Sequence, residues 1–192
     1  MQMPSSNPIR RGFAWLLAVA LMLAAAAWLW TMPMVRAALE ALRLSRMPVP
    51  LELPVPVQGV QAARIADTWG GARSGGRRHE GVDIFAARST PVLSATRGLV
   101  ARIGDHGIGG KHVWVLGPGG ERHYYAHLDE WAPGLHAWQV VRAGEPLGAV
   151  GSTGNARGTP PHLHYGIYAS GGAVNPHPRL GAPANPAFTE SR

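Results

Sequence analysis

The strongest constraint on this chain is a run of 24 residues without a charged side chain, residues 12–35, which follows two arginines. About 20 apolar residues are enough for a helix to cross a lipid bilayer, and tryptophans gather near both interfaces of such helices. The tryptophans near the two ends of the run are Trp15, Trp28 and Trp30. The sequence therefore predicts a transmembrane signal-anchor helix over residues 12–35, after a short N-terminal segment, residues 1–11.

A cleaved signal peptide is the alternative to this anchor. Its apolar core would be residues 13–23, and its small-residue cleavage site would be the three alanines at 24–26. The apolar run continues beyond that site through residues 28–30, which favours the uncleaved form. Arginines flank the run on both sides, so the positive-inside rule does not give its orientation.

Residues 36–56 consist of two segments of different composition. Residues 36–46 combine leucines with arginine and glutamate, a composition that predicts a juxtamembrane helix. The prolines that follow break any helix and predict a stiff, extended linker as far as residue 56. These prolines are Pro48, Pro50, Pro54 and Pro56.

From residue 57 onward the pattern consists of short β-type runs separated by glycine. The chain has 25 glycines and 17 prolines, and we find no long amphipathic helix after residue 57. This favours many short strands over a helical bundle or alternating strands and helices. The sequence therefore predicts an all-β fold. The candidate strands are residues 81–85, 91–95, 98–103, 112–116, 122–128, 146–150 and 162–168.

Two histidines in the last of these strands, His162 and His164, project from the same face, because residues i and i+2 of a strand do so. Two neutral imidazoles suit a divalent transition metal, or a metal ligand beside a proton-transfer group. The alternative to such a site is a pair of polar residues on the solvent-exposed face of an edge strand. The chain has no cysteine, so any metal must bind to His, Asp or Glu.

Two other clusters contain histidines. On an extended segment His79 and Asp83 share a face and can reach one ion, although a surface ion pair has the same spacing. In residues 122–128, alternation places His123, Tyr125 and His127 on one strand face, and we expect His123 on a mixed surface.

The formal charge of +7 is carried almost wholly by arginine. Such a charge can attract nucleic acid, anionic lipid or an acidic wall polymer. The sequence contains no nucleic-acid-binding motif and no basic helix, and an arginine-rich, alanine-rich composition is typical of a GC-rich genome. We therefore expect no nucleic-acid partner.

Taken in order, the segments HxxxD (residues 79–83), YAHL (residues 125–128) and HLH (residues 162–164) resemble the lysostaphin-type or LytM-type zinc metallopeptidases. The resemblance covers about residues 50–178 and includes the sequence segments between these three motifs. It implies a duplicated hybrid motif fold, a compact antiparallel β domain of sandwich and barrel character, over residues 57–180. A disordered tail, residues 181–192, follows.

The resemblance also assigns roles by position. It implies that His79, Asp83 and His164 bind one Zn²⁺ and leave a tetrahedral position open for water. His127 and His162 are then the catalytic pair beside the metal.

Two more residues of the matching sequence, Arg73 and Asn155, are candidate substrate-binding residues. Glu80 is expected to be solvated or to orient a neighbour. The remaining histidines match no motif position; they are His106, His112, His123, His136 and His177.

The function that the resemblance implies is hydrolysis of peptidoglycan peptides. The anchor then places the enzyme in the inner membrane, and the substrate places its domain in the periplasm and residues 1–11 in the cytoplasm. A non-catalytic peptidoglycan-binding or amidase-activating module of the same family is the first alternative, and a regulatory partner is not identified. A small-molecule metalloenzyme on a cupin-like barrel is the second, although such sites usually place a glutamate soon after HxH, and here Tyr-Gly-Ile-Tyr follows.

Overall fold

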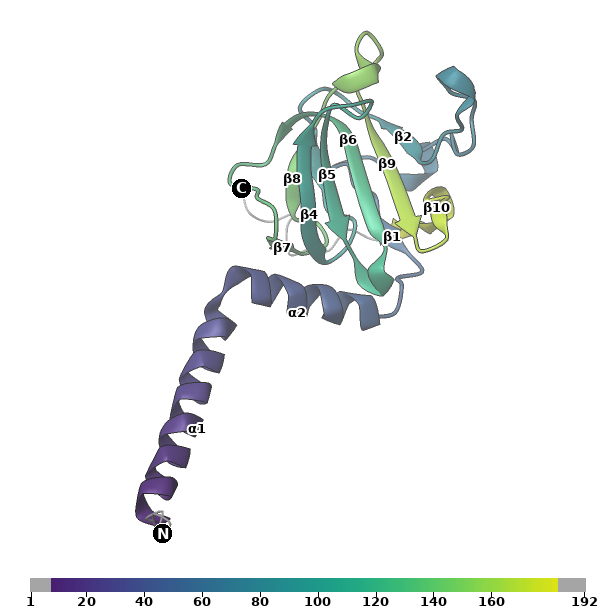
Figure 1. The fold of residues 1–192 in the computed structure, drawn as a ribbon. Coiled ribbons are helices and arrows are strands. Elements are labelled where there is room, and N and C mark those ends of the chain that lie inside the picture. The colour runs from purple at the N-terminus through teal and green to yellow at the C-terminus, as the bar shows by residue number, and fades with distance from the viewer. Residues whose placement is uncertain (1–7, 183–192) are drawn as a thin grey trace. The chain divides into compact units, whose positions relative to one another are not determined.

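The computed structural model describes residues 8–182 (Figure 1), and the chain divides into two units between residues 39 and 40. The first unit contains α1 (Pro8–Thr31), a helix of 24 residues. Its part from Arg11 to Thr31 is long and apolar enough to cross a membrane, by length and composition. The helix expected over residues 12–35 is present, but it ends before Pro33, whose ring cannot continue a helical turn.

A second helix, α2 (Pro33–Arg46), begins at this proline, whose fixed φ suits the first position of a helix. Its last turns belong to the second unit. There Leu44 is fully buried, and Glu40 Oε1 accepts a hydrogen bond of 2.6 Å from Arg97 Nη2. A helix is thus present over residues 36–46, where leucines alternate with charged side chains.

The second unit is built on one nine-stranded sheet in which every pairing is antiparallel. The all-β antiparallel fold class is therefore confirmed. The sheet branches, because β9 pairs with three strands and β6 with three (Figure 1). Its main path is β10 (Gly172–Val174), β9 (His162–Ala169), β6 (Arg122–Trp131), β5 (Lys111–Leu116), β4 (Gly98–Asp105) and β7 (Val140–Val141). The branches are β2 (Val82–Phe85) on β9, and β8 (Pro146–Val150) on β6 with β3 (Pro91–Leu93) on β8.

All seven expected strands are present, with bounds that differ by up to three residues. Four short strands were not expected: β7, β10, β1 (Leu53–Pro54) and β11 (Leu180–Ala182), of which the last two form a separate parallel pair. Each has only two or three residues, too few for an alternating pattern to be recognised. Residues 181 and 182 of the expected tail belong to β11, and residues 183–192 lie outside the described part of the chain.

The core lies on one side of the strands that carry the functional residues. In β2, Val82 and Ile84 are buried, so Asp83 points to the opposite face. In β9, Leu163, Tyr165 and Ile167 are buried in the same way. Leu53, in the expected linker, and Val57, directly after it, also belong to this core.

His123 is in the core and not on a mixed surface, so that expectation is wrong. Its side chain is fully buried, and its Nδ1 lies 2.8 Å from the hydroxyl of Tyr165. The reason is strand alternation, which sends His123 and Tyr125 inward while Tyr124 faces outward. Burial, followed by the positive charge of Arg179, lowers the pKa of His123 to about 3.

We predict that His123 makes the fold sensitive to acid. Between pH 6.5 and about 3 the unfolded chain binds a proton on this imidazole and the folded chain does not. The free energy of unfolding therefore falls as the pH falls through this window, by at most about 1.4 kcal/mol per pH unit for one group. Urea unfolding of the full chain in mild detergent, at pH 7, 5 and 4, measures this slope.

The variant His123→Gln cannot take up this proton, so its unfolding free energy should fall less steeply with pH than that of the unmodified chain. The slopes are compared, because the substitution also changes stability at pH 7. Equal slopes would show that His123 contributes nothing to acid unfolding.

Candidate metal centre

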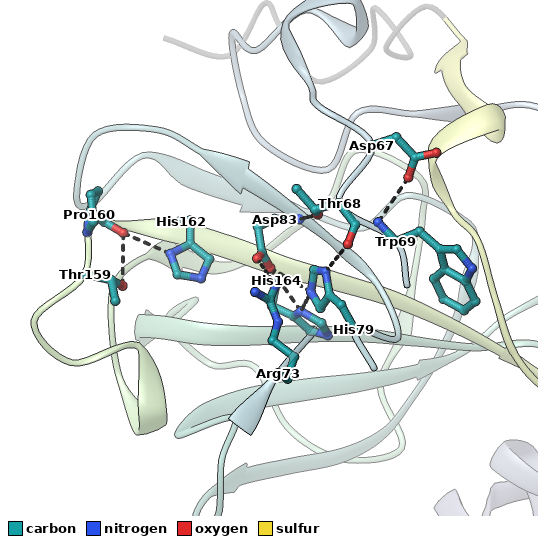
Figure 2. Close-up of polar contacts among 10 residues, drawn as sticks. All are labelled: Asp67, Thr68, Trp69, Arg73, His79, Asp83, Thr159, Pro160, His162 and His164. Carbon is teal, nitrogen blue, oxygen red and sulfur yellow. Dashed lines mark hydrogen bonds and ion pairs between the residues drawn. The ribbon is translucent and has the colours of Figure 1, made fainter. Parts of the chain in front are cut away.

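Three side chains converge at the end of β2 and β9. Asp83 and His164 face each other across this antiparallel pair, and His79 enters from the loop before β2. His79 Nε2 lies 3.0 Å from Asp83 Oδ1 and 2.8 Å from His164 Nδ1, and His164 Nδ1 lies 3.2 Å from Asp83 Oδ1. Figure 2 shows the three groups turned toward one point. Residues 85 positions apart in the sequence thus share one centre.

Neighbouring groups hold these side chains in place (Figure 2). The Nδ1–H of His79 donates to the backbone carbonyl of Thr68 at 2.7 Å, which leaves Nε2 to face the centre. The hydroxyl of Thr68 accepts the backbone N–H of Asp83 at 3.0 Å. Arg73 Nη2 donates to Asp83 Oδ2 at 2.5 Å, so Oδ1 is the carboxylate oxygen directed at the two imidazoles.

The protonation states of Asp83 and His164 suit a metal site. Burial opposes the ionisation of Asp83, but hydrogen bonds from His164 and His79 and their charges outweigh it and hold the pKa of this carboxyl well below its usual range. Burial lowers the pKa of His164, against the opposing hydrogen bond and charge of Asp83. An ionised carboxylate and a neutral imidazole are the forms that bind a metal ion.

The donor set fits a small divalent ion. One ligand atom from each of the three side chains lies within 4.8 Å of the others. Around a tetrahedral zinc ion at ~2.0–2.1 Å from each ligand, the ligand atoms are about 3.3 Å apart. The observed separations of 2.8 to 3.2 Å require only small adjustments to reach that geometry. Three protein ligands leave one tetrahedral position open, as in catalytic zinc sites.

Gly81 is necessary for the placement of His164. A Cβ atom on Gly81 would lie 2.7 Å from Cε1 of His164 and 2.6 Å from the carbonyl oxygen of Tyr165. The His164 ring occupies the space that a side chain at position 81 would need. Any residue larger than glycine at this position would therefore displace the ring or the strand β9.

Two more imidazoles lie beside the three donors. The ring of His127 lies 5.1 Å from that of His162 and 5.9 Å from that of His164, between ring centres. The Nδ1–H of His127 donates to the carbonyl of Thr153, and that of His162 to the carbonyl of Pro160, each at 2.9 Å. Each ring therefore keeps Nε2 as its free nitrogen. Burial, followed by the charges of His164 and His162, lowers the pKa of His127 to about 4.

His127 lies on the opposite face from the one that strand alternation predicts. His123 and Tyr125 point into the core, but His127 points to the side of Tyr124 and His164. The cause is a backbone irregularity: His127 has φ 64°, the pairing of β6 with β5 shifts register between Tyr125 and Leu128, and its pairing with β8 shifts between Leu128 and Glu130. Such a bulge re-aims a side chain, and no feature of the sequence alone indicated it.

The five side chains line one cleft of about 620 Å³. Arg73 and Asn155 also line it, as does Glu80, which is exposed. None of the other histidines does; these are His106, His112, His123, His136 and His177. Tyr124, with its ring 5.9 Å from that of His164, and the backbone carbonyls of Thr68 and Thr153 are parts of the site that the sequence did not indicate. Carbonyl groups are common to every residue, so no side-chain pattern reveals them.

Comparisons with known proteins agree with this geometry. Residues 77–176 match Peptidase family M23. The "L-Ala--D-Glu endopeptidase" of Bacillus subtilis is 40% identical over 140 residues, which are 67% of this chain and 42% of that protein. The chain spans less than half of the length of the curated relatives that it matches.

Solved structures are similar in fold. The "putative glycyl-glycine endopeptidase lytM" of Ruminococcus gnavus has a TM-score of 0.55 at 30% identity, over 76% of this chain and 68% of that one. The catalytic domain of lysostaphin from Staphylococcus simulans has a TM-score of 0.53 at 29% identity, over 60% of this chain and 90% of that one. The family match covers more than half of the chain and includes His79, Asp83, His127, His162 and His164. The chain belongs to peptidase family M23, the family of the LytM-type and lysostaphin-type peptidases.

Proposed function

We propose that the chain is a zinc-dependent endopeptidase that hydrolyses peptide bonds of peptidoglycan, with one Zn²⁺ held by His79, Asp83 and His164. The observation that supports it most directly is the convergence of these three donors in an open cleft, with two further imidazoles beside them. The name of one relative, the "Peptidoglycan DD-endopeptidase ShyA" of Vibrio cholerae, supports the substrate.

The side chains of the cleft have different roles in the proposed reaction. A zinc ion in this site would polarise the scissile carbonyl and activate a water molecule for attack. His127 is neutral at pH 7 because its pKa is lowered to about 4, so its Nε2 is able to accept a proton from the attacking water. His127 and His162 together stabilise the developing oxyanion and pass a proton to the leaving amine. Arg73 and Asn155 contact the substrate, and Arg73 also fixes the carboxylate of Asp83.

The non-catalytic alternative, a module that binds peptidoglycan or activates an amidase, has less support. Such a role does not require metal ligands, yet this chain has all three in one place and two imidazoles positioned by backbone carbonyls.

Metal loading tests the proposed function. The full chain, purified in detergent and loaded with zinc, should bind one zinc ion and release peptides from purified peptidoglycan. A chelator should stop the release and added zinc should restore it. His79→Ala, Asp83→Ala and His164→Ala should lose the zinc, whereas His136→Ala, an exposed histidine outside the cleft, should keep it. Mass spectrometry of the digest and metal analysis give both results. Bound zinc with no released peptide would leave the non-catalytic alternative as the better account.

The two imidazoles beside the donors should act in turnover and not in metal binding. We predict that His127→Ala and His162→Ala each keep one zinc ion and lower kcat by about 10²- to 10⁴-fold, the usual contribution of an acid or base group. The same digest, followed over time, gives the rates, and His136→Ala is again the matched control. Wild-type rates in a folded, zinc-loaded His127→Ala or His162→Ala variant would exclude that residue from catalysis.

We also propose that α1 anchors the enzyme in the inner membrane, with the domain of residues 57–180 in the periplasm and residues 1–11 in the cytoplasm. The length and apolar composition of the helix support the anchor, and the substrate supports the orientation.

For this anchor, the chain isolated from bacterial membranes should keep its full mass and resist alkaline carbonate extraction. The domain should be cleaved by protease in spheroplasts but be protected in inverted vesicles. A soluble form that begins shortly after residue 26 would instead indicate a cleaved signal peptide.

A further inference from the structure

Three arginines line one wall of the cleft. They belong to the loop of residues 70–78, which leads directly into His79, and they are Arg73, Arg77 and Arg78. The loop folds back on itself: the backbone N–H of Arg73 donates to the carbonyl of Arg77, and Ala72 pairs with Arg78. Gly75 and Gly76, at φ 73° and 71°, make the turn that this requires. A defined backbone therefore holds these three arginines in the lining of the cleft.

Among residues 8–182, carboxylates do not balance all the charges of this wall. The cleft is lined by two carboxylates. That of Asp83 is engaged by Arg73 and the two imidazoles. That of Glu80 lies beside the hydroxyl of Tyr168, whose pKa is raised to about 12 by burial and then by the charge of Glu80.

Arg77 and Arg78 have no carboxylate partner within residues 8–182. Arg77 Nε donates to the carbonyl of Ser74 at 3.2 Å, and Arg78 Nη1 donates to the carbonyl of Gly70 at 3.3 Å. These bonds orient the two side chains and neutralise neither charge. Both residues are exposed on the cleft, so their remaining N–H groups are accessible to a ligand.

We propose that Arg77 and Arg78 form a subsite for a free carboxylate of the substrate, so that the enzyme prefers acidic peptides to uncharged bridges. This inference rests on the proposed endopeptidase function and specifies its substrate class. A guanidinium binds a carboxylate through two parallel hydrogen bonds, and this geometry favours arginine over a simple positive charge.

The position of the subsite defines which carboxylate it takes. Arg77 and Arg78 line the same cleft as His79, Asp83 and His164. The carboxylate therefore belongs to a substrate residue that lies in this cleft together with the scissile bond. A glutamate in a peptidoglycan peptide meets this requirement, because it has two carboxyl groups and chain continuation uses only one.

A pair of substrates that differ in one charge tests the subsite. The probes are two purified peptidoglycan fragments that are identical except that the free carboxylate of glutamate is intact in one and amidated in the other. The zinc-loaded full chain should cleave the acid with a kcat/KM at least about tenfold above that of the amide, since hydrogen bonds between charged groups are the strong ones. In the double variant Arg77→Gln/Arg78→Gln this ratio should fall to near one.

Arg142→Gln is the matched control, because Arg142 is exposed and lies outside the cleft, and it should keep the ratio of the unmodified chain. Zinc content and circular dichroism verify that the double variant is folded. A ratio near one in the unmodified chain, or an unchanged ratio in the double variant, would overturn the subsite.

The proposed function and the subsite can fail separately. If the zinc-loaded chain cleaves neither fragment, the endopeptidase function is wrong. Calorimetric titration with the two fragments then tests the subsite alone: tighter binding of the acid that is lost in the double variant supports it, and equal dissociation constants reject it.

Discussion

The pairing of β2 with β9 is the interaction on which the site depends. It places Asp83 opposite His164, while Val82 and Ile84 on one strand and Leu163 and Tyr165 on the other fill the core. A slip of one residue in either strand would turn a ligand into the core and an apolar side chain into the cleft. Hydrophobic burial therefore sets the geometry of the candidate metal site.

Backbone carbonyls complete that geometry. His79, His127 and His162 each donate Nδ1–H to a carbonyl oxygen, those of Thr68, Thr153 and Pro160. The acceptor fixes which nitrogen carries the hydrogen and which faces the cleft. Because the acceptors are main-chain atoms, a change of side chain at these positions keeps them, whereas a change in loop conformation removes them.

The sequence predicted those parts of the structure that a regular residue pattern or a motif of fixed spacing indicates. Alternation located seven strands, and the family resemblance carried by HxxxD and HxH located the three donors. It did not predict features that depend on single backbone angles or on very short elements. The positive φ of His127 reversed the face of that side chain, and β1 and β11 have no pattern of their own. Alternation alone does predict that His123 shares a face with Tyr125, but not that this face is the core.

The segments at either end of the second unit are joined to each other. Arg179 donates two hydrogen bonds of 2.9 Å to Glu121 and one of 2.6 Å to the carbonyl of Pro50, and β1 pairs with β11 beside them. Residues 50–54 and residues 179–182 therefore lie at neighbouring points of the unit. A unit with adjacent ends can be carried as an insert within a longer polypeptide without disturbing its interior. This architecture gives a simple physical basis for the occurrence of such units in proteins more than twice as long as the aligned part.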